Sequence, residues 1–252
     1  MPNGWIRPIT PRVLVESLRI IKSTKSANVI RLSSLLSVEA RRASEICTQL
    51  ASMGLLRQFG ADQVIITEEG IRFFDCVIKD DKDRLHYQLL QYEPYKNVCS
   101  TLEKQDLTLD EIVSRSGLNQ VATETILRLI EWVGKLQRSN DGHCYITMKQ
   151  AGTLDAFLRD VDSTLDELTR FGPGIKREFI RIPEVRDILC RHLHLPFADF
   201  DRLLSETVSK WPNRFELSSA PTRVAGERVE GGFRLHNRQY FYIRRLRGEV
   251  TQ

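Results

Sequence analysis

The side chains best suited to metal or covalent chemistry stand together in Cys190-Arg191-His192-Leu193-His194. On a helix, residues four apart share a face, so Cys190 and His194 would lie together while His192 points elsewhere. A zinc ion needs about four ligands in tetrahedral geometry, and no further ligands accompany this pair. We therefore expect a metal-free role for the cluster, on the surface or in the core.

Other arrangements that could support catalysis are incomplete. The pair His143-Cys144 has no nucleophile or base beside it in the sequence. The Gly-Pro-Gly segment at 172–174 lacks the lysine and serine with which a phosphate-binding loop holds a nucleotide and its magnesium ion. The acidic run at 80–83 is expected to be a solvated linker. The sequence thus predicts no catalytic residues, no cofactor and no small-molecule substrate.

The length and composition are those of an ordinary globular protein. A chain of 252 residues can hold two or three small domains. It contains five unclustered cysteines, an odd number that favours reduced thiols in a cytoplasmic protein, or a nuclear one in a eukaryote. No run of eighteen apolar residues is present, so we expect no membrane span. The first residues lack the layout of a signal peptide.

The charged side chains are distributed unevenly along the chain. The net charge is +4, from 37 basic and 33 acidic residues. Counted by segment, it is +4 over residues 1–79, −5 over residues 80–170 and +5 over residues 171–252. This layout predicts that the outer segments can approach an anionic polymer and that the middle one does not. Chance variation on solvated faces is the alternative.

One segment recurs eighty positions along the chain. Gly54 corresponds to Gly134, and the Ile-Thr pair at 66–67 corresponds to the Ile-Thr pair at 146–147. An apolar helical pattern precedes each copy, and small polar turns occupy 59–62 and 139–142. Helix, short strand, turn and strand are therefore expected twice. This period is too long for a solenoid repeat and suits two small domains.

Residues 10–80 show the pattern of a first module. Apolar residues at helical spacing predict helices around 14–21, 29–36 and 43–53, with Ser37 as the N-cap of the third. Residues 55–58 and 63–67 are expected to form a hairpin. A closing helix over 68–79 would place Ile71, Phe74 and Ile78 inside.

Three helices followed by a hairpin resemble the winged-helix superfamily. In that superfamily the third helix enters the DNA major groove and the wing contacts the backbone or minor groove. The resemblance implies that Arg41, Arg42 and Gln49 face DNA, with Arg57 and Gln58 at the base of the wing. Arginine and glutamine can read guanine and adenine, respectively. The alternative is that the arginines only make the helix soluble.

The second copy has the same pattern but a different surface. A capping box at 108–111, a turn at Gly117 and a cap at Asn119 precede its third helix. We expect this helix to expose Gln120, Thr123, Glu124, Arg128 and Glu131, which is not a basic face. Such a face opposes the approach of phosphates, so this copy is expected to pack against or bind protein.

An amphipathic helix is predicted over residues 153–171. Its apolar stripe has spacing similar to that of a coiled coil, with Asp and Glu on the opposite side. Two alternatives remain open: the helix joins a homodimer or protein partner, or it packs on its own domain. The residues expected at a protein interface are Leu154, Phe157, Val161 and Leu168.

Residues 173–252 form a basic third segment, with two helices and then a hairpin that has a long tip. This order resembles that of a divergent winged helix. Arginines alternate here with the aromatic run at 240–242 and could bind phosphates and stack on bases, or could simply be solvated. The residues expected to contact nucleic acid are Arg223, Arg228, Arg234, Arg238, Arg244, Arg245 and Arg247.

These observations predict a mainly α protein with small β-hairpins, built from three tandem domains at 1–80, 81–172 and 173–252. We expect it to bind DNA without catalysis, as a transcriptional regulator or a subunit of a DNA complex, and not to bind a membrane. The alternative is a scaffold subunit of a multiprotein assembly, as in the accessory proteins of condensin or in ESCRT-II. In that case the helices would bind protein and not DNA.

Overall fold

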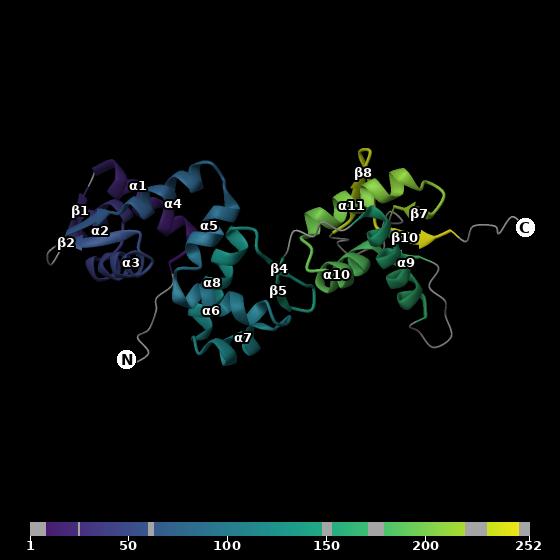
Figure 1. The fold of residues 1–252 in the computed structure, drawn as a ribbon, viewed down its shortest axis with the longest axis horizontal. Helices are drawn as coiled ribbons and strands as arrows, with labels where there is room; N and C mark the ends of the chain where they lie inside the picture. Colours follow the sequence, from purple (N-terminus) through teal and green to yellow (C-terminus); the bar gives the residue numbers. More distant parts are fainter. Residues whose placement is uncertain are drawn as a thin grey trace, which may run out of the picture. The chain divides into compact units, whose positions relative to one another are not determined.

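The computed structural model describes residues 9–24, 26–59, 63–147, 153–170, 179–219 and 231–246. These residues form eleven helices and ten short strands, all paired antiparallel (Figure 1). The expected fold class, mainly helical with small β-hairpins, is confirmed. The chain divides into two compact units, residues 1–146 (unit 1) and residues 147–252 (unit 2).

The first half of unit 1 runs from helix α1 to helix α4. Its three strands form one sheet in the order β1-β3-β2, so the first strand lies beside the third. The hairpin β2–β3 follows the third helix directly, as the sequence predicts. The elements are α1 (Pro11–Thr24), β1 (Ser26–Asn28), α2 (Val29–Leu36), α3 (Ala40–Ser52), β2 (Leu56–Phe59), β3 (Gln63–Ile66) and α4 (Glu68–Ile78).

The second half of unit 1 repeats this arrangement with one strand reduced. A single bridge between Leu107 and Cys144 stands where the first half has β1, and β5 again lies between the bridge and β4. The predicted capping box of Thr108 and Glu111 is present, and Gly117 makes the turn that follows helix α7. The elements are α5 (Lys82–Leu89), α6 (Glu93–Leu102), α7 (Leu109–Ser116), α8 (Gln120–Trp132), β4 (Leu136–Arg138) and β5 (Cys144–Ile146).

The eighty-residue repeat of the sequence is a repeat in three dimensions. Helices α3 and α8 begin and end at corresponding positions. Gly54 and Gly134 follow them with φ of 74° and 71°, in the left-handed region that glycine adopts readily. The strand pairing is also equivalent, with Leu56 opposite Ile66 and Leu136 opposite Ile146.

Unit 2 has the same element order with an insertion. Its main sheet is ordered β6-β10-β7, again first, third, second. The inserted hairpin β8–β9 turns at His236 and Asn237, whose φ values of 45° and 63° suit a tight two-residue turn. The elements are α9 (Leu154–Arg170), β6 (Ile180–Arg181), α10 (Ile182–His192), α11 (Phe197–Lys210), β7 (Phe215–Ser218), β8 (Phe233–Leu235), β9 (Arg238–Tyr240) and β10 (Tyr242–Arg245).

The two halves of unit 1 share one apolar core. A single cluster of buried side chains extends from Ile9 to Ile146. The Phe73 ring on α4 lies 6.4 Å from the Trp132 ring at the end of α8, and the Lys82 ammonium sits 5.3 Å from the centre of that indole. The expected modules 1–80 and 81–172 are therefore not separate compact bodies, because they bury apolar surface against each other.

Helix α9 belongs to unit 2 and serves as its first helix. Its apolar face packs on α10 and α11, and the Phe157 ring lies 5.7 Å from the Phe200 ring of α11. Phe157 and Val161 are buried, and Leu154 and Leu168 are half-buried. The prediction that Phe157 and Val161 form a protein interface is therefore wrong. Coiled-coil-like spacing marks an apolar stripe but does not say which chain covers it.

Two local predictions in the first half are also wrong. Helix α4 buries Gly70, Phe73 and Cys76, and leaves Ile71 and Ile78 37% and 68% exposed. Apolar residues occur on both faces of α4, and its connection to β3 decides which face turns inward. Ser37 is the C-cap of α2, with φ of 54°, and not the N-cap of α3. The turn before the third helix needs a left-handed residue here, as it does at Gly117.

We expect Gly70→Ala to destabilise unit 1 although alanine favours helix. An added Cβ would lie 2.2 Å from the Leu55 carbonyl oxygen, a backbone atom that cannot move alone. Overpacking of this kind typically costs about 1–3 kcal/mol. Urea unfolding followed by circular dichroism measures the loss. The control Ser52→Ala, at an exposed position of α3, should unfold at the wild-type midpoint, and an unchanged midpoint for Gly70→Ala would contradict the prediction.

Candidate nucleic-acid interface

Helix α3 presents a narrow polar stripe to solvent. Its inner face is buried through Ala43, Ile46, Cys47 and Leu50. Each successive turn of the outer face exposes a small side chain with a hydroxyl group. Among the residues of this stripe, only Arg41 is charged. The Arg41 side chain is 82% exposed. The exposed positions of the stripe are Arg41, Ser44, Thr48 and Ser52.

The structure separates Arg41 from the other two residues expected on this helix. The Glu45 carboxylate lies 3.5 Å from the Arg41 guanidinium and 3.2 Å from that of Arg42. Arg42 is only 22% exposed, and Gln49 is half-buried. The charges of Arg41, Arg42 and Glu45 sum to +1. Arg41 therefore projects from the helix as the sequence predicts, whereas Arg42 and Gln49 lie against it.

Strand β2 brings two more expected residues to the surface. Leu56 points into the core, and Arg57, Gln58 and Phe59 are exposed. The strand is at the edge of its sheet, so one side of it has no strand neighbour. Arg57 forms no ion pair with any carboxylate of the residues that the structure describes. Among the described residues, no carboxylate therefore competes with an external anion for this guanidinium.

The beginning of α3 differs from that of the equivalent helix α8. In α8 the Asn119 side chain accepts a hydrogen bond of 2.8 Å from the Ala122 N–H. In α3 the N-cap is Glu39, whose side chain makes no such bond. The first turn of a helix has N–H groups without helical partners, and these can donate to an anion. The N-terminus of α8 thus has a side-chain cap, whereas that of α3 has none and carries the acidic Glu39 at its N-cap position.

The outer face of α8 is not basic, as predicted, but one of its expected residues is misplaced. Thr123 is fully buried, and Val121 is 64% exposed instead. The Glu124 carboxylate accepts from Arg138 at 3.0 Å and also pairs with Arg128 at 3.5 Å. Arg128 of this face and Arg138 of β4 are thereby engaged by one carboxylate. This face of the second half therefore offers little to a phosphate.

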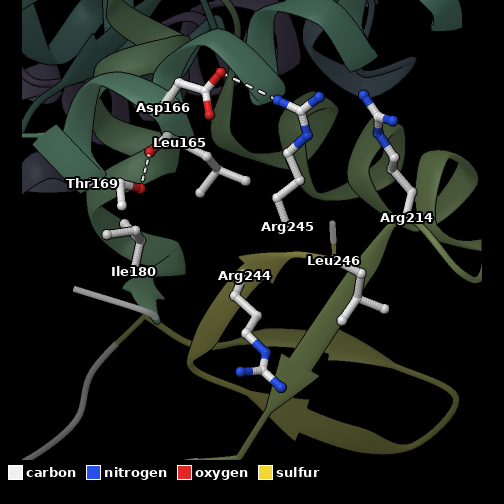
Figure 2. Close-up of a pocket in the computed structure, with 8 residues that line it drawn as sticks. All are labelled: Leu165, Asp166, Thr169, Ile180, Arg214, Arg244, Arg245 and Leu246. Carbon is white, nitrogen blue, oxygen red and sulfur yellow. Dashed lines mark hydrogen bonds and ion pairs between the residues drawn. The ribbon is translucent and has the colours of Figure 1, made fainter. Parts of the chain in front are cut away.

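The arginines expected to contact nucleic acid in unit 2 fall into three groups. Arg234 and Arg238 are exposed on the inserted hairpin β8–β9. Arg244 and Arg245 lie on β10 and line a pocket of about 430 Å³ (Figure 2). The remaining three lie outside the described residues: Arg223, Arg228 and Arg247.

The pocket beside β10 is balanced in charge. Arg245 pairs with Asp166 at 3.2 Å, Arg214 pairs with Asp162, and Arg244 donates to Glu216 at 2.6 Å. Figure 2 shows the Arg245 side chain reaching Asp166 while Arg244 points away from it.

Three guanidinium groups thus face three carboxylates. Arg245 joins β10 to α9, and Arg244 joins β10 to the neighbouring strand β7. Both arginines therefore have partners within unit 2, and their expected contact with nucleic acid stays a prediction.

A buried arginine that sequence reasoning missed ties unit 2 together. Arg186 on α10 is 8% exposed and donates to the Asp201 carboxylate of α11 at 3.3 Å and to the Gly231 carbonyl. Its guanidinium also lies 5.4 Å from the centre of the Phe197 ring. Burial raises the pKa of Asp201, and the Arg186 charge opposes that rise. The one sign of this structural role in the sequence is that Arg186 lies among the apolar residues of α10.

We expect Arg186→Met to destabilise unit 2 by about 2–3 kcal/mol, because Asp201 would keep a poorly solvated charge without its partner. Asp201 is 36% exposed, so the loss should stay below that of a fully buried pair. Denaturant unfolding measures it, with Arg202→Met on the exposed face of α11 as control. Adding Asp201→Leu should recover part of the loss. Equal stability of Arg186→Met and Arg202→Met would show that the Arg186–Asp201 pair does not stabilise unit 2.

The structure shows the surroundings of the cysteine and histidine side chains that could support catalysis or metal binding. All five cysteines are buried, and burial raises the thiol pKa of Cys47 to about 11 and that of Cys99 to about 12, so neither is a ready nucleophile. Cys190 is buried and His192 is exposed. The described part of the chain holds no group of three or more His, Cys, Asp and Glu side chains arranged for a metal ion.

The turn between β4 and β5 contains a Ser-Asp-His cluster that the sequence did not indicate. The Asp141 carboxylate accepts from the Ser139 hydroxyl and lies 2.9 Å from Nδ1 of His143. These hydrogen bonds hold the pKa of Asp141 far below its usual range. The carboxylate stands between the serine and the histidine, so the imidazole cannot take the serine proton as in a catalytic triad. The cluster closes the turn.

Comparison with known proteins adds no family to this description. No protein-family model matches the chain, and no curated protein matches it. Within the described residues, no helix combines the length and the apolar character needed to cross a membrane.

Proposed function

We propose that the chain is a non-catalytic DNA-binding protein built from three winged-helix modules. The support for the architecture is that one pattern occurs three times. In each copy a helix, a strand or bridge, two further helices and a hairpin follow one another, and the first strand pairs with the third. The third copy, which lacks the repeated sequence motif, follows the same order with α9 as its first helix.

The binding face that we propose is the outer stripe of α3 with the neighbouring strand β2. The observation that carries this proposal is the exposed Arg41, which lies in the first turn of α3, where no side chain of the N-cap residue bonds to the helix. A phosphate there would accept from the backbone N–H groups and from the guanidinium. The small side chains of Ser44 and Thr48 would let the helix approach a groove closely. Arg57 and Gln58 would contact the backbone at the wing.

The exposed hairpin of unit 2 supplies a second cationic element to this proposal. Arg234 and Arg238 would add contacts to phosphates that depend on charge and not on base sequence. These contacts suit a transcriptional regulator or a subunit of a DNA complex, in which one module reads the duplex and another increases the affinity.

A salt series of duplex binding tests the proposal. Each phosphate contact contributes about 0.9 to the slope of log K against log salt, so Arg41→Ala/Arg57→Ala should flatten the slope by about 2. Fluorescence anisotropy of a labelled duplex gives the affinity at each salt concentration. The control is Arg72→Ala, whose side chain is 60% exposed on α4, a helix outside the proposed face. No binding by wild type at low salt, or equal slopes for both variants, would reject the proposed face.

A second candidate function is assembly with protein through the second half of unit 1. The observation that favours it is Val121, an aliphatic side chain 64% exposed on the outer face of α8, where the equivalent helix in the first half carries Arg41. Glu131 is also exposed there. An acidic and apolar surface suits a protein partner or a second copy of the chain, as in a scaffold subunit.

If Val121 lies in a self-association surface, Val121→Glu should lower the association constant of the dimer, because a charge would be buried against the partner. Sedimentation velocity over a concentration series measures the mass in solution. Ile30→Glu, at a position 68% exposed on α2, is the matched control and should leave the mass unchanged. A wild-type protein that is monomeric at every concentration would exclude association through this face.

A further inference from the structure

The hairpin β2–β3 carries an aromatic side chain that the core does not use. Phe59 is 66% exposed at the end of β2. Residues two apart in a strand project from the same face, so Phe59 and Arg57 stand side by side. The described residues of the two strands, 56–59 and 63–66, carry one charged side chain, and it is Arg57. The strand thus pairs a cation with a flat apolar ring on one open face.

The two other copies of the fold do not repeat this pair. The position equivalent to Phe59 in the second copy is Ser139, which is 6% exposed and bonded within its turn. The position equivalent to Arg57 is Gln137, which is half-buried. In unit 2, the corresponding strand β7 ends in Ser218, which is half-buried. Since the shared fold does not need an exposed aromatic here, Phe59 is not explained by the architecture.

The chemistry of the pair fits a particular form of nucleic acid. A guanidinium binds phosphate, and an aromatic ring stacks on the face of a base. Base faces are hidden in an intact duplex, because each base is stacked between its neighbours, and become accessible where bases are unpaired. A protein partner would also cover an apolar ring, but the cation beside Phe59 and the lack of acidic residues on the described strands favour an anionic polymer.

We propose that Phe59 stacks on an unpaired base, with Arg57 holding the adjacent phosphate, so that the protein prefers a duplex bearing a single-stranded overhang to a blunt duplex. This inference rests on the proposed nucleic-acid binding and specifies its substrate class. Helix α3 engages the duplex, and the edge strand β2 receives the first unpaired bases. The preference resides in the first copy of the fold, the only one in which the described residues show this pair.

The test compares two probes, a blunt duplex and the same duplex with a single-stranded overhang. Stacking of one base on an aromatic side chain typically changes affinity about 5- to 100-fold, so wild type should prefer the overhang by a factor in that range. Phe59→Ala should bind both probes equally. Tyr87→Ala removes an aromatic that is 70% exposed on α5, and should keep the preference. Both residues are exposed, so equal unfolding midpoints verify that neither variant is misfolded.

A second readout reports stacking directly. With 2-aminopurine at the first overhang position, stacking on Phe59 should change the base fluorescence on binding of wild type and of Tyr87→Ala, but not of Phe59→Ala. If wild type binds both probes equally, or if Phe59→Ala keeps the preference, the stacking inference fails while the proposed function stands. If wild type binds neither probe at low salt, the proposed function fails and the inference fails with it.

Discussion

The turn that ends the third helix is the constraint on which the repeated halves of unit 1 depend. Gly54 and Gly134 adopt left-handed backbone geometry, and the next N–H then donates to the carbonyl five residues back, from Leu55 to Leu50 and from Lys135 to Ile130. This reversal satisfies helix-end carbonyls and directs the chain into a hairpin whose first strand buries a leucine. Because both copies turn at the same residue, their helices and strands keep one register.

Unit 2 reaches the same strand order without this glycine. Trp211 is the C-cap of helix α11, and its N–H donates to the Thr207 carbonyl. The Arg214 N–H then donates to the Trp211 carbonyl before β7 begins. In unit 2, arginines add ion pairs to the apolar contacts between the elements. Arg186 joins α10 to α11, and Arg245 joins β10 to α9. The basic composition of this segment is therefore in part a structural requirement, and overall charge alone is a poor guide to where nucleic acid would bind.

A shared backbone with different surfaces is the principle that connects the proposals. The outer face of the third helix carries Arg41 in the first copy and Val121 in the second, although the two helices have the same length and place in the fold. Outward side chains contribute little to stability, so they can differ without loss of fold. The functions proposed for this protein therefore depend on the few positions where one copy departs from the others, and Phe59 is such a position.

The sequence by itself determined the helices, the hairpins that follow the third helices and their repetition, but not the short strands β1 and β6. Apolar spacing marked the helices, and glycine marked the turns after α3 and α7, because these signals act over a few residues. The tertiary structure decided which surface covers each stripe. It placed α9 within unit 2, turned Phe73 and not Ile78 inward on α4, and buried Thr123 on α8. It also paired Arg245 with Asp166, 79 residues earlier. Periodicity shows that a helix has an apolar face, but contacts between distant residues decide what that face and its charges meet.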